Sequence, residues 1–413
     1  MALRSRAVGP LLALPLLLAG AAAARAEADW LERDRLTGSW QGVRPILDEH
    51  GFELYLTYTG MMWSVPAGGD ESGTEFSGYL DFGFDLDLEK LGAPHGSGFH
   101  ADFHWYQGRD PTSVLLGGTF AMAVDEWEAS NALRVFNLYF RQDFGDDRYQ
   151  IQAGQIAADS SFMAARYAGL FVNAAYGDLP NENVNTNTPV YPLAAPGVYL
   201  EGKPDDSFTF RSALYTGNAG QDLSGNHGFG WKLGNNAGYA LYTELTLHTQ
   251  PGGLEGNTTL GGYYVAGNFP VIGTDETRYG NYDVYVMLDH ALALDERGKP
   301  KVGAFARFSV SPQQDRNLGF LYGDAGLNVF APIDSRPDDV AGLAVGILRA
   351  SGHDQLSSSS PVSLPSGQAV LELTYQAAVT PWLTLQPDLQ LILDPVFSQS
   401  DALVIGVQAV ALF

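Results

Sequence analysis

The chain has 413 residues, with 47 acidic against 23 basic side chains and no cysteine. The formal net charge of −24 argues against nucleic acid and anionic substrates as partners, and the missing cysteines exclude disulfides and thiolate metal sites. Only 17% of the residues are charged, while 12% are aromatic and 48 are glycine. This composition favours a membrane β-barrel over a soluble domain, which usually carries about 25% charged residues.

Residues 1–26 have the organisation of an export signal. Arg4 and Arg6 precede a run rich in Leu and Ala, and Ala24-Arg25-Ala26 matches a cleavage site. The run is too short and too interrupted to predict a membrane-spanning helix, and no later segment is a long apolar helix. We therefore expect a signal peptide over 1–26, followed by an N-terminal periplasmic segment over 27–51.

The segment 36–51 predicts a short helix ahead of the first strand. Ser39 is a suitable N-cap, Pro45 fits the first half of a helix, and Gly51 ends it.

From Phe52 onward, apolar and polar residues alternate with a period of two, which predicts β-strands. The pattern recurs in sixteen segments: 52–63, 78–90, 98–108, 131–144, 148–157, 197–204, 206–216, 239–249, 257–267, 281–294, 300–310, 317–330, 339–350, 368–379, 382–393 and 402–413. An even number near 16 at this chain length indicates an all-β transmembrane fold, an antiparallel outer-membrane β-barrel over 52–413.

The links between these segments alternate in length. We expect long excursions at 64–77, 109–130, 158–196, 217–238, 268–280 and 351–367, and tight turns at 145–147, 205, 295–299 and 380–381. An outer-membrane barrel with both termini in the periplasm has this asymmetry, whereas a soluble β-sandwich has no reason to show it.

Rows of polar side chains on the strands indicate a water-filled interior. In 78–90, Leu80, Phe82 and Phe84 alternate with Asp81 and Asp85. Burying such a polar row in a dry core would be prohibitive. The strands are therefore expected to surround a channel, with the apolar row facing lipid.

The last segment, 402–413, is expected to close the barrel by pairing with 52–63. Its row from Leu403 to Phe413 would face lipid, and Gln408 would face the lumen. The terminal Phe413 resembles the aromatic ending by which barrel-assembly machinery recognises its clients, so this machinery is an expected partner.

Several segments carry a family resemblance. Residues 36–44 read Leu-Thr-Gly-Ser-Trp-Gln-Gly-Val-Arg, and further matches lie at 137–144 with 152–155, at 171–175 and at 380–388. In this order they resemble the carbohydrate-selective porin (OprB) family, whose opening motif is Leu-Thr-Gly-x-Trp-Gly-Gly-x-Arg, with Gln41 here in place of Gly. The resemblance implies a sixteen-stranded porin in the outer membrane of a Gram-negative bacterium. It also implies passive diffusion of mono- and oligosaccharides, usually glucose, with no cofactor.

A pore for neutral sugars needs a narrow ring of hydrogen-bonding groups, because a polyol offers only hydroxyl donors and acceptors. The longest link, 158–196, is the natural constriction, although a solvated surface loop is the alternative. The candidate residues are Asp159, Arg166, Asn173 and Tyr176 in this link, and Asn137, Arg141, Arg211, Arg307, Asp85 and His104 on the wall. The resemblance implies Arg and Glu groups that grip sugar hydroxyls, while a structural salt bridge is the alternative for any single Arg.

Other functions have weaker support in the sequence. A general-diffusion porin with weak cation preference remains the alternative function. An enzyme is not expected, since no Gly-x-Ser-x-Gly motif occurs. No metal site is expected either, because His100, Asp102 and His104 follow one another at every second position of a strand, where neighbouring side chains on one face are about 7 Å apart. The expected partners are neutral sugars and outer-membrane lipids, with no nucleic acid, and the sequence leaves open a monomer or a homotrimer.

Overall fold

The structure is a computed structural model, which describes residues 29–119, 122–124, 131–221, 225–234, 237–351, 366–395 and 400–413. Its strands are β1 (Phe52–Gly69), β2 (Gly73–Asp87), β3 (Ser97–Gly108), β4 (Leu133–Phe144), β5 (Tyr149–Ile156), β6 (Ala195–Asp205), β7 (Phe208–Thr216), β8 (Tyr239–Thr249), β9 (Gly256–Pro270), β10 (Thr277–Leu294), β11 (Pro300–Val310), β12 (Gly319–Phe330), β13 (Val340–Ala350), β14 (Gly367–Thr380), β15 (Leu383–Leu393) and β16 (Ser400–Leu412). The helical elements are α2 (Val43–Glu49), α3 (Pro111–Leu115), α4 (Pro180–Asn185), and the 3-10 turns η1 (Ala158–Ser160), η2 (Ala168–Leu170), η3 (Ala174–Tyr176) and η4 (Pro251–Gly253). Within the described ranges, no helix has both the length and the apolar character needed to cross a membrane.

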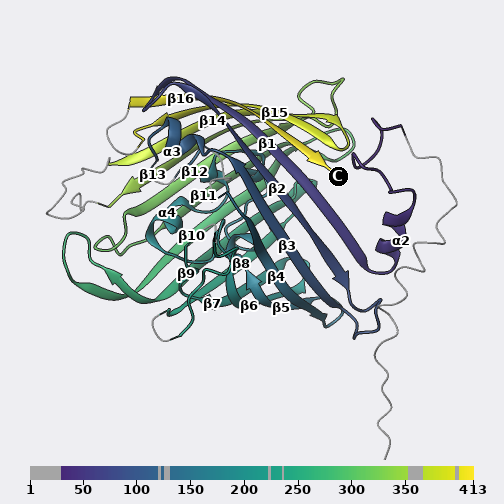
Figure 1. Ribbon diagram of the computed structural model, residues 1–413, viewed down its shortest axis with the longest axis horizontal. Helices are drawn as coiled ribbons and strands as arrows, with labels where there is room; N and C mark the ends of the chain where they lie inside the picture. The colour runs from purple at the N-terminus through teal and green to yellow at the C-terminus, as the bar shows by residue number, and fades with distance from the viewer. Residues whose placement is uncertain are drawn as a thin grey trace, which may run out of the picture.

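The strands form one closed barrel in which each strand pairs with its neighbours in the chain and β1 pairs with β16. This confirms the predicted sixteen-stranded antiparallel barrel. Helix α2 and the C-terminus lie at the same end of the barrel, and α3 lies toward the other end (Figure 1). The expected signal peptide over 1–26 lies outside the described residues.

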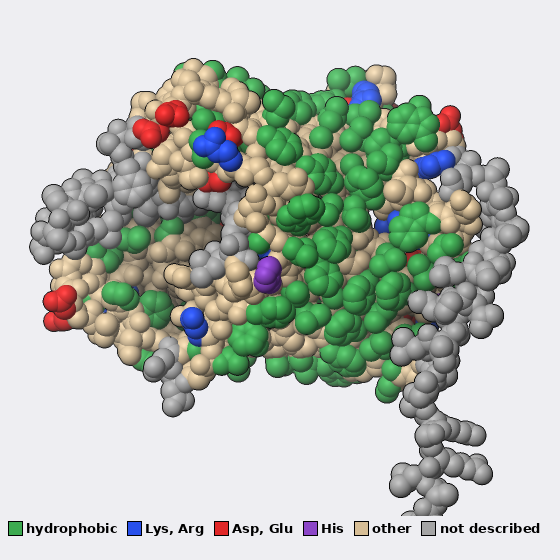
Figure 2. Space-filling model, viewed as in Figure 1, with side chains coloured by type: hydrophobic (Ala, Val, Ile, Leu, Met, Phe, Trp, Pro, Cys, Tyr) green, Lys and Arg blue, Asp and Glu red, His purple; other side chains and the backbone are tan. Residues whose placement is uncertain are grey.

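The period-two pattern sorts side chains between the two faces of the wall. On β14, Leu371 and Leu373 are exposed on the outer surface, whereas Val370 and Glu372 are fully buried inside the barrel. Figure 2 shows such apolar side chains gathered into a broad band across the outside of the strands. This band is the surface that a lipid bilayer would cover.

The barrel closes where the sequence predicts. β1 and β16 pair from Thr57 opposite Leu412 to Trp63 opposite Gly406. Trp63 is fully buried, and a Cβ atom at position 406 would lie 2.1 Å from its ring, so only glycine leaves room for this side chain. The backbone N–H of Phe413 donates to the carbonyl of Leu56 (2.9 Å).

The N-terminal segment lies across this end of the barrel. The backbone N–H of Leu36 donates to the carbonyl of Leu412 (2.8 Å), and the indole N–H of Trp382 donates to the carbonyl of Trp30 (2.8 Å). The rings of Trp30 and Trp382 have centroids 5.4 Å apart. The segment is thereby attached both to the last strand and to the turn before β15.

The predicted N-terminal helix is present, but Ser39 is not its N-cap. The helix begins at Val43 and its N-cap is Gly42 (φ 92°), while the Ser39 hydroxyl accepts from the Gly42 N–H (3.2 Å). The helix starts late because Trp40 and Gln41 have positive φ angles of 53° and 59°. Left-handed backbone favours glycine, which is the residue that the resembled family usually has at the position of Gln41.

Two of the predicted long links are wrong. β1 and β2 continue until Val65 faces Gly73, and β9 and β10 continue until Pro270 faces Thr277. The first hairpin can turn sharply because Gly68 and Gly69 have φ angles of 76° and 68°. Most of the predicted link 351–367 lies outside the described residues.

Candidate functional site

The chain between β5 and β6 folds into the barrel. It carries η1, η2, η3 and α4, and its side chains Phe162, Met163, Ala175 and Leu179 are fully buried in one apolar cluster with inward-facing residues of the wall. A solvated surface loop would leave these side chains in water. We call residues 157–194 the constriction loop.

Carboxylates of the wall hold the backbone of the constriction loop. They accept hydrogen bonds from its N–H groups as follows: Glu244 from Met163 (2.7 Å), Asp289 from Arg166 (2.9 Å) and Tyr167 (3.0 Å), and Glu372 from Val172 (2.7 Å) and Asn173 (3.0 Å). All three carboxylates are buried. The irregular stretches between the short helical turns of this loop can be buried here because these groups satisfy their backbone donors.

Arg307 on β11 holds the carbonyl groups of the same loop. Its guanidinium donates to the carbonyls of Met163 (3.1 Å), Ala175 (2.8 Å) and Gly177 (2.7 Å). It also forms a fully buried ion pair with Asp324 (2.6 Å). The structural salt bridge considered as the alternative for a lumen arginine is therefore the arrangement found at Arg307.

Other predicted residues also lie in the wall or behind the loop. Asn137 is buried, donating to Asp102 (3.0 Å) and accepting from the N–H of Ala157 (2.8 Å) at the start of the loop. His104 is buried with its ring 4.3 Å from that of Phe136, measured between centroids.

Asn173 and Arg211 are likewise occupied by structural contacts. Asn173 is fully buried and donates to Gln390 (2.9 Å). Arg211 lies between Glu201 (2.8 Å) and Glu244 (3.5 Å). Asn173 is therefore enclosed between the loop and the wall, whereas Arg211 keeps 24% of its side chain exposed.

Three predicted residues face cavities near the end of the barrel that holds α2. Asp85 and Arg141 line a cavity of about 430 Å³, where Asp85 contacts His100 (2.9 Å). Arg166 lines a second cavity, of about 420 Å³, and lies 3.5 Å from Glu255. Each cavity therefore contains groups of both charges.

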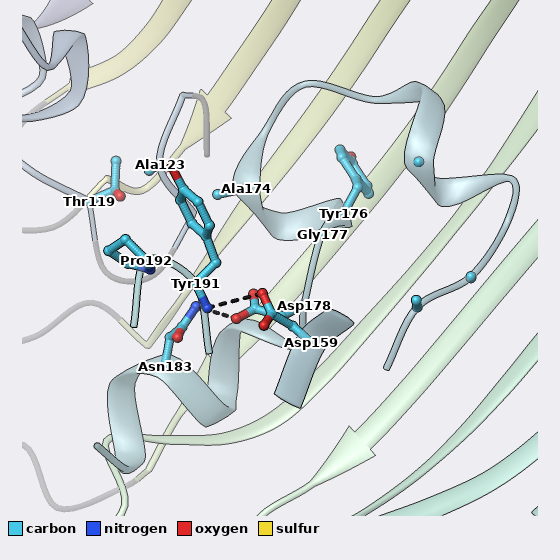
Figure 3. A pocket seen from close by; sticks show the side chains of 13 residues that line it. Thr119, Ala123, Asp159, Ala174, Tyr176, Gly177, Asp178, Asn183, Tyr191 and Pro192 are labelled. Atoms are coloured by element: carbon cyan, nitrogen blue, oxygen red, sulfur yellow. Dashed lines mark hydrogen bonds between the residues drawn. The ribbon is translucent and has the colours of Figure 1, made fainter. Parts of the chain in front are cut away.

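A third cavity, of about 490 Å³, lies between the constriction loop and the loop that precedes β4, and we call it the central cavity. The predicted residues Asp159 and Tyr176 line it, together with Asp178, Asn183 and Tyr191. In Figure 3, Asp159 and Asp178 point toward the same part of this central cavity, next to Asn183 and Tyr191. Its volume is within the range of about 300–1,000 Å³ that is usual for small-molecule sites.

The two carboxylates of the central cavity differ in their partners. Asp159 accepts from the N–H of Tyr191 (3.0 Å) through Oδ2, whereas its Oδ1 is buried without a hydrogen-bond partner. Asp178 accepts from the amide of Asn183 (2.7 Å). Burial raises the pKa of Asp159 to about 7 and that of Asp178 to about 6, and the charge of Asp178 adds to the shift at Asp159.

Sequence reasoning missed Asp178, Asn183 and Tyr191. All three lie in the constriction loop, where no periodic pattern shows which side chain faces the lumen. The polar content of the loop was the only available signal. Within the described part of the chain, no group of three or more His, Asp or Glu residues could hold a metal ion.

A closed sixteen-stranded barrel with an apolar outer band, a polar interior and a loop folded into its lumen is an outer-membrane porin. The model of the carbohydrate-selective porin, OprB family, matches residues 72–413. The chain belongs to this family. It is a passive carbohydrate channel in the outer membrane of a Gram-negative bacterium.

Individual relatives agree with this assignment. The chain is 24% identical to Porin B of Pseudomonas aeruginosa over 451 residues, which cover 99% of this chain and 98% of that protein. It is similar to the high-pH structure of Pseudomonas putida OprB, with a TM-score of 0.84 and 22% identity over 94% of this chain and 100% of that one. The low-pH structure of the same protein has a TM-score of 0.62 and 19% identity, over 92% and 99% of the two chains. These likenesses in structure show the shared fold.

Proposed function

We propose that the central cavity is where this porin selects neutral, glucose-type mono- and oligosaccharides. The observation that carries the proposal is the set of groups around it. Asp159 and Asp178 supply acceptors for sugar hydroxyls, Asn183 supplies both donors and acceptors, and the partly exposed ring of Tyr191 offers flat apolar surface for a pyranose. The ring of Tyr176 is fully buried against Phe171 and Phe305 and supports the cavity from behind.

The remaining predicted residues would support this function in two ways. Asp85, Arg141 and Arg166 would line the route between the central cavity and the periplasm. Asn137, Arg211, Arg307, Asn173 and His104 would position the wall and the constriction loop. This division follows from the cavities and hydrogen bonds in which each residue takes part.

Ion current through single channels in a planar bilayer tests the proposal. We expect glucose and maltose to reduce the current in a concentration-dependent way, because a sugar held in the cavity excludes ions. A general-diffusion porin with weak cation preference is the second candidate, favoured by the two carboxylates in the cavity. If sugars leave the current unchanged while solutes pass according to size alone, the second candidate replaces the first.

We further propose that the chain performs no covalent chemistry and that residues 1–26 are removed as a signal peptide, leaving 27–51 as the periplasmic segment and 52–413 as the barrel. The apolar outer band would contact outer-membrane lipids. The porin would function as a monomer or a homotrimer, without a cofactor.

Deletion of Phe413 should lower the amount of protein assembled in the outer membrane without changing sugar preference. Phe413 directly follows Leu412, the last residue of the strand that closes the barrel, and is proposed as the residue that barrel-assembly machinery recognises. It is not among the residues lining the central cavity. Heat-modifiable migration of the membrane fraction measures assembly, and sugar block of the assembled channels measures preference. A Phe413→Tyr variant, which keeps an aromatic ending, is the control. Normal assembly of the deletion variant would rule out this role.

A further inference from the structure

The charge of the central cavity is not balanced. Asp159 and Asp178 both line it, and its described lining residues include no Lys or Arg. The two cavities near the end of the barrel that holds α2 differ, since Arg166 lines one and Arg141 lines the other.

The nearest arginines are committed to other partners. Arg307 contacts the loop through the carbonyl of Gly177 but is paired with Asp324. Arg134 donates to the carbonyl of Pro192 (3.5 Å), and its guanidinium lies 4.8 Å from the centroid of the Tyr106 ring. Neither arginine is among the residues lining the cavity. The charge of Arg307 opposes the rise in the pKa of Asp178, so Asp159 is the carboxylate that faces the cavity without a matching cation.

One acceptor in the cavity is left unsatisfied by the protein. Oδ1 of Asp159 is buried and has no hydrogen-bond partner. A buried carboxylate oxygen without a donor is costly, and the neighbouring charge of Asp178 adds repulsion. A ligand that brings both N–H donors and a positive charge would remove both costs.

We infer that the central cavity is a site for sugars that carry an ammonium group, such as hexosamines, which it binds in preference to neutral sugars of the same size. The inference rests on the proposed function of the cavity as the sugar-selecting site. An ammonium group has three donors and forms short, charge-assisted hydrogen bonds to carboxylates. Tyr191 would contact the rest of the sugar ring, and acidic sugars would be repelled.

Ion-current block by four sugars tests the inference on the full-length porin. At pH 7.0, where the amine of glucosamine is mostly protonated, we expect glucosamine to block at a concentration about 10-fold lower than glucose, because charge-assisted hydrogen bonds are about twice as strong as neutral ones. N-acetylglucosamine, which lacks the charge, should lose this advantage, and glucuronate should block less than glucose. This comparison of ligands does not depend on the folding of any variant.

Variants then assign the preference to the two carboxylates. In Asp159→Asn and Asp178→Asn, the ratio of the glucosamine block to the glucose block should fall toward 1. Asp334→Asn, which removes an exposed carboxylate in the turn between β12 and β13, is the matched control and should keep the wild-type ratio.

The preference should also fall between pH 7 and pH 5, a range in which the amine of glucosamine stays mostly protonated. The raised pKa values of Asp159 and Asp178, about 7 and about 6, mean that both carboxylates lose their charge over this range and are mostly neutral at pH 5. Among the described residues, Glu182, which is bonded to Tyr242 and Thr188, and Arg307 also act on Asp178. The phenols of Tyr215 and Tyr263, which act on Asp159 and Asp178 respectively, stay neutral over this range, because a phenol ionises only near about pH 10 or above.

Two results would overturn the inference. One is a wild-type channel that glucosamine blocks no better than glucose, and the other is an unchanged ratio in both Asp variants. In either case, block by glucose would still support the proposed function. Absence of block by every sugar would instead overturn the proposed function itself.

Discussion

Replacing Arg307 with Met should release the constriction loop while leaving the barrel closed. The guanidinium is fully buried and donates to three loop carbonyls and to Asp324. Removing one partner of a buried ion pair typically costs about 3–5 kcal/mol, because the other charge stays buried. The strand ladders do not depend on this side chain, so the loss should fall on the loop.

Single-channel conductance is the measurement that distinguishes a displaced constriction loop from a damaged barrel. We expect Arg307→Met to conduct more than the wild type and to lose its block by sugar, with heat-modifiable migration unchanged. The double variant Arg307→Met/Asp324→Leu removes the unpaired carboxylate as well and should recover part of the stability. Unchanged conductance in the single variant would show that the wall carboxylates Glu244, Asp289 and Glu372 hold the loop without Arg307.

Adding a methyl group at Gly303 or Gly342 should also displace the constriction loop. A Cβ atom at position 303 would lie 2.2 Å from the ring of Tyr167, and one at position 342 would lie 2.6 Å from Leu170 and 2.9 Å from Phe171. These wall glycines thus make room for side chains that the loop brings to the wall. Overpacking of this kind costs about 1–3 kcal/mol, and the flexible partner is the loop rather than the strands.

Limited proteolysis and conductance together test this second prediction. Gly303→Ala and Gly342→Ala should make the constriction loop easier to cleave and increase the conductance. Gly323→Ala is the control, since a Cβ atom there would meet nothing closer than 3.7 Å. If all three variants behave alike, the effect comes from losing glycine in a strand and not from contact with the loop.

The barrel could be predicted because its strands repeat one simple rule. Alternation of apolar and polar residues identified all sixteen strands, and the apolar row of β16 identified the pairing with β1. The ends of strands were less certain: Gly68 and Gly69 let β1 and β2 extend by several residues, and nothing in the alternation marks that turn. Similarly, Ser39 has the chemistry of an N-cap, but the positive φ angles after it delay the helix to Val43.

The site could be predicted only in outline. The long polar segment between β5 and β6 indicated a constriction, but its contacts with the wall leave no recognisable pattern in the sequence. An inward-facing carboxylate such as Glu244 or Glu372 has the same appearance in the sequence whether water or a loop covers it. For the same reason, Arg307 could be placed inside the barrel but not assigned to the loop backbone, and Asp178 was not singled out at all.

The wall residues that bind the constriction loop lie far from it along the chain, and this bears on the order in which the channel folds. Glu244 is 81 residues from its partner Met163, and Gln390 is 217 residues from its partner Asn173. Contacts between such distant residues form late, because the intervening chain must first be ordered. Asn137 on β4 holds only the start of the constriction loop, so until β8 to β15 are in place the middle of the loop lacks the carboxylates and the arginine that bind its backbone. Narrowing of the pore is therefore a final step of folding, and an incompletely assembled barrel would be a wider and less discriminating opening than the finished one.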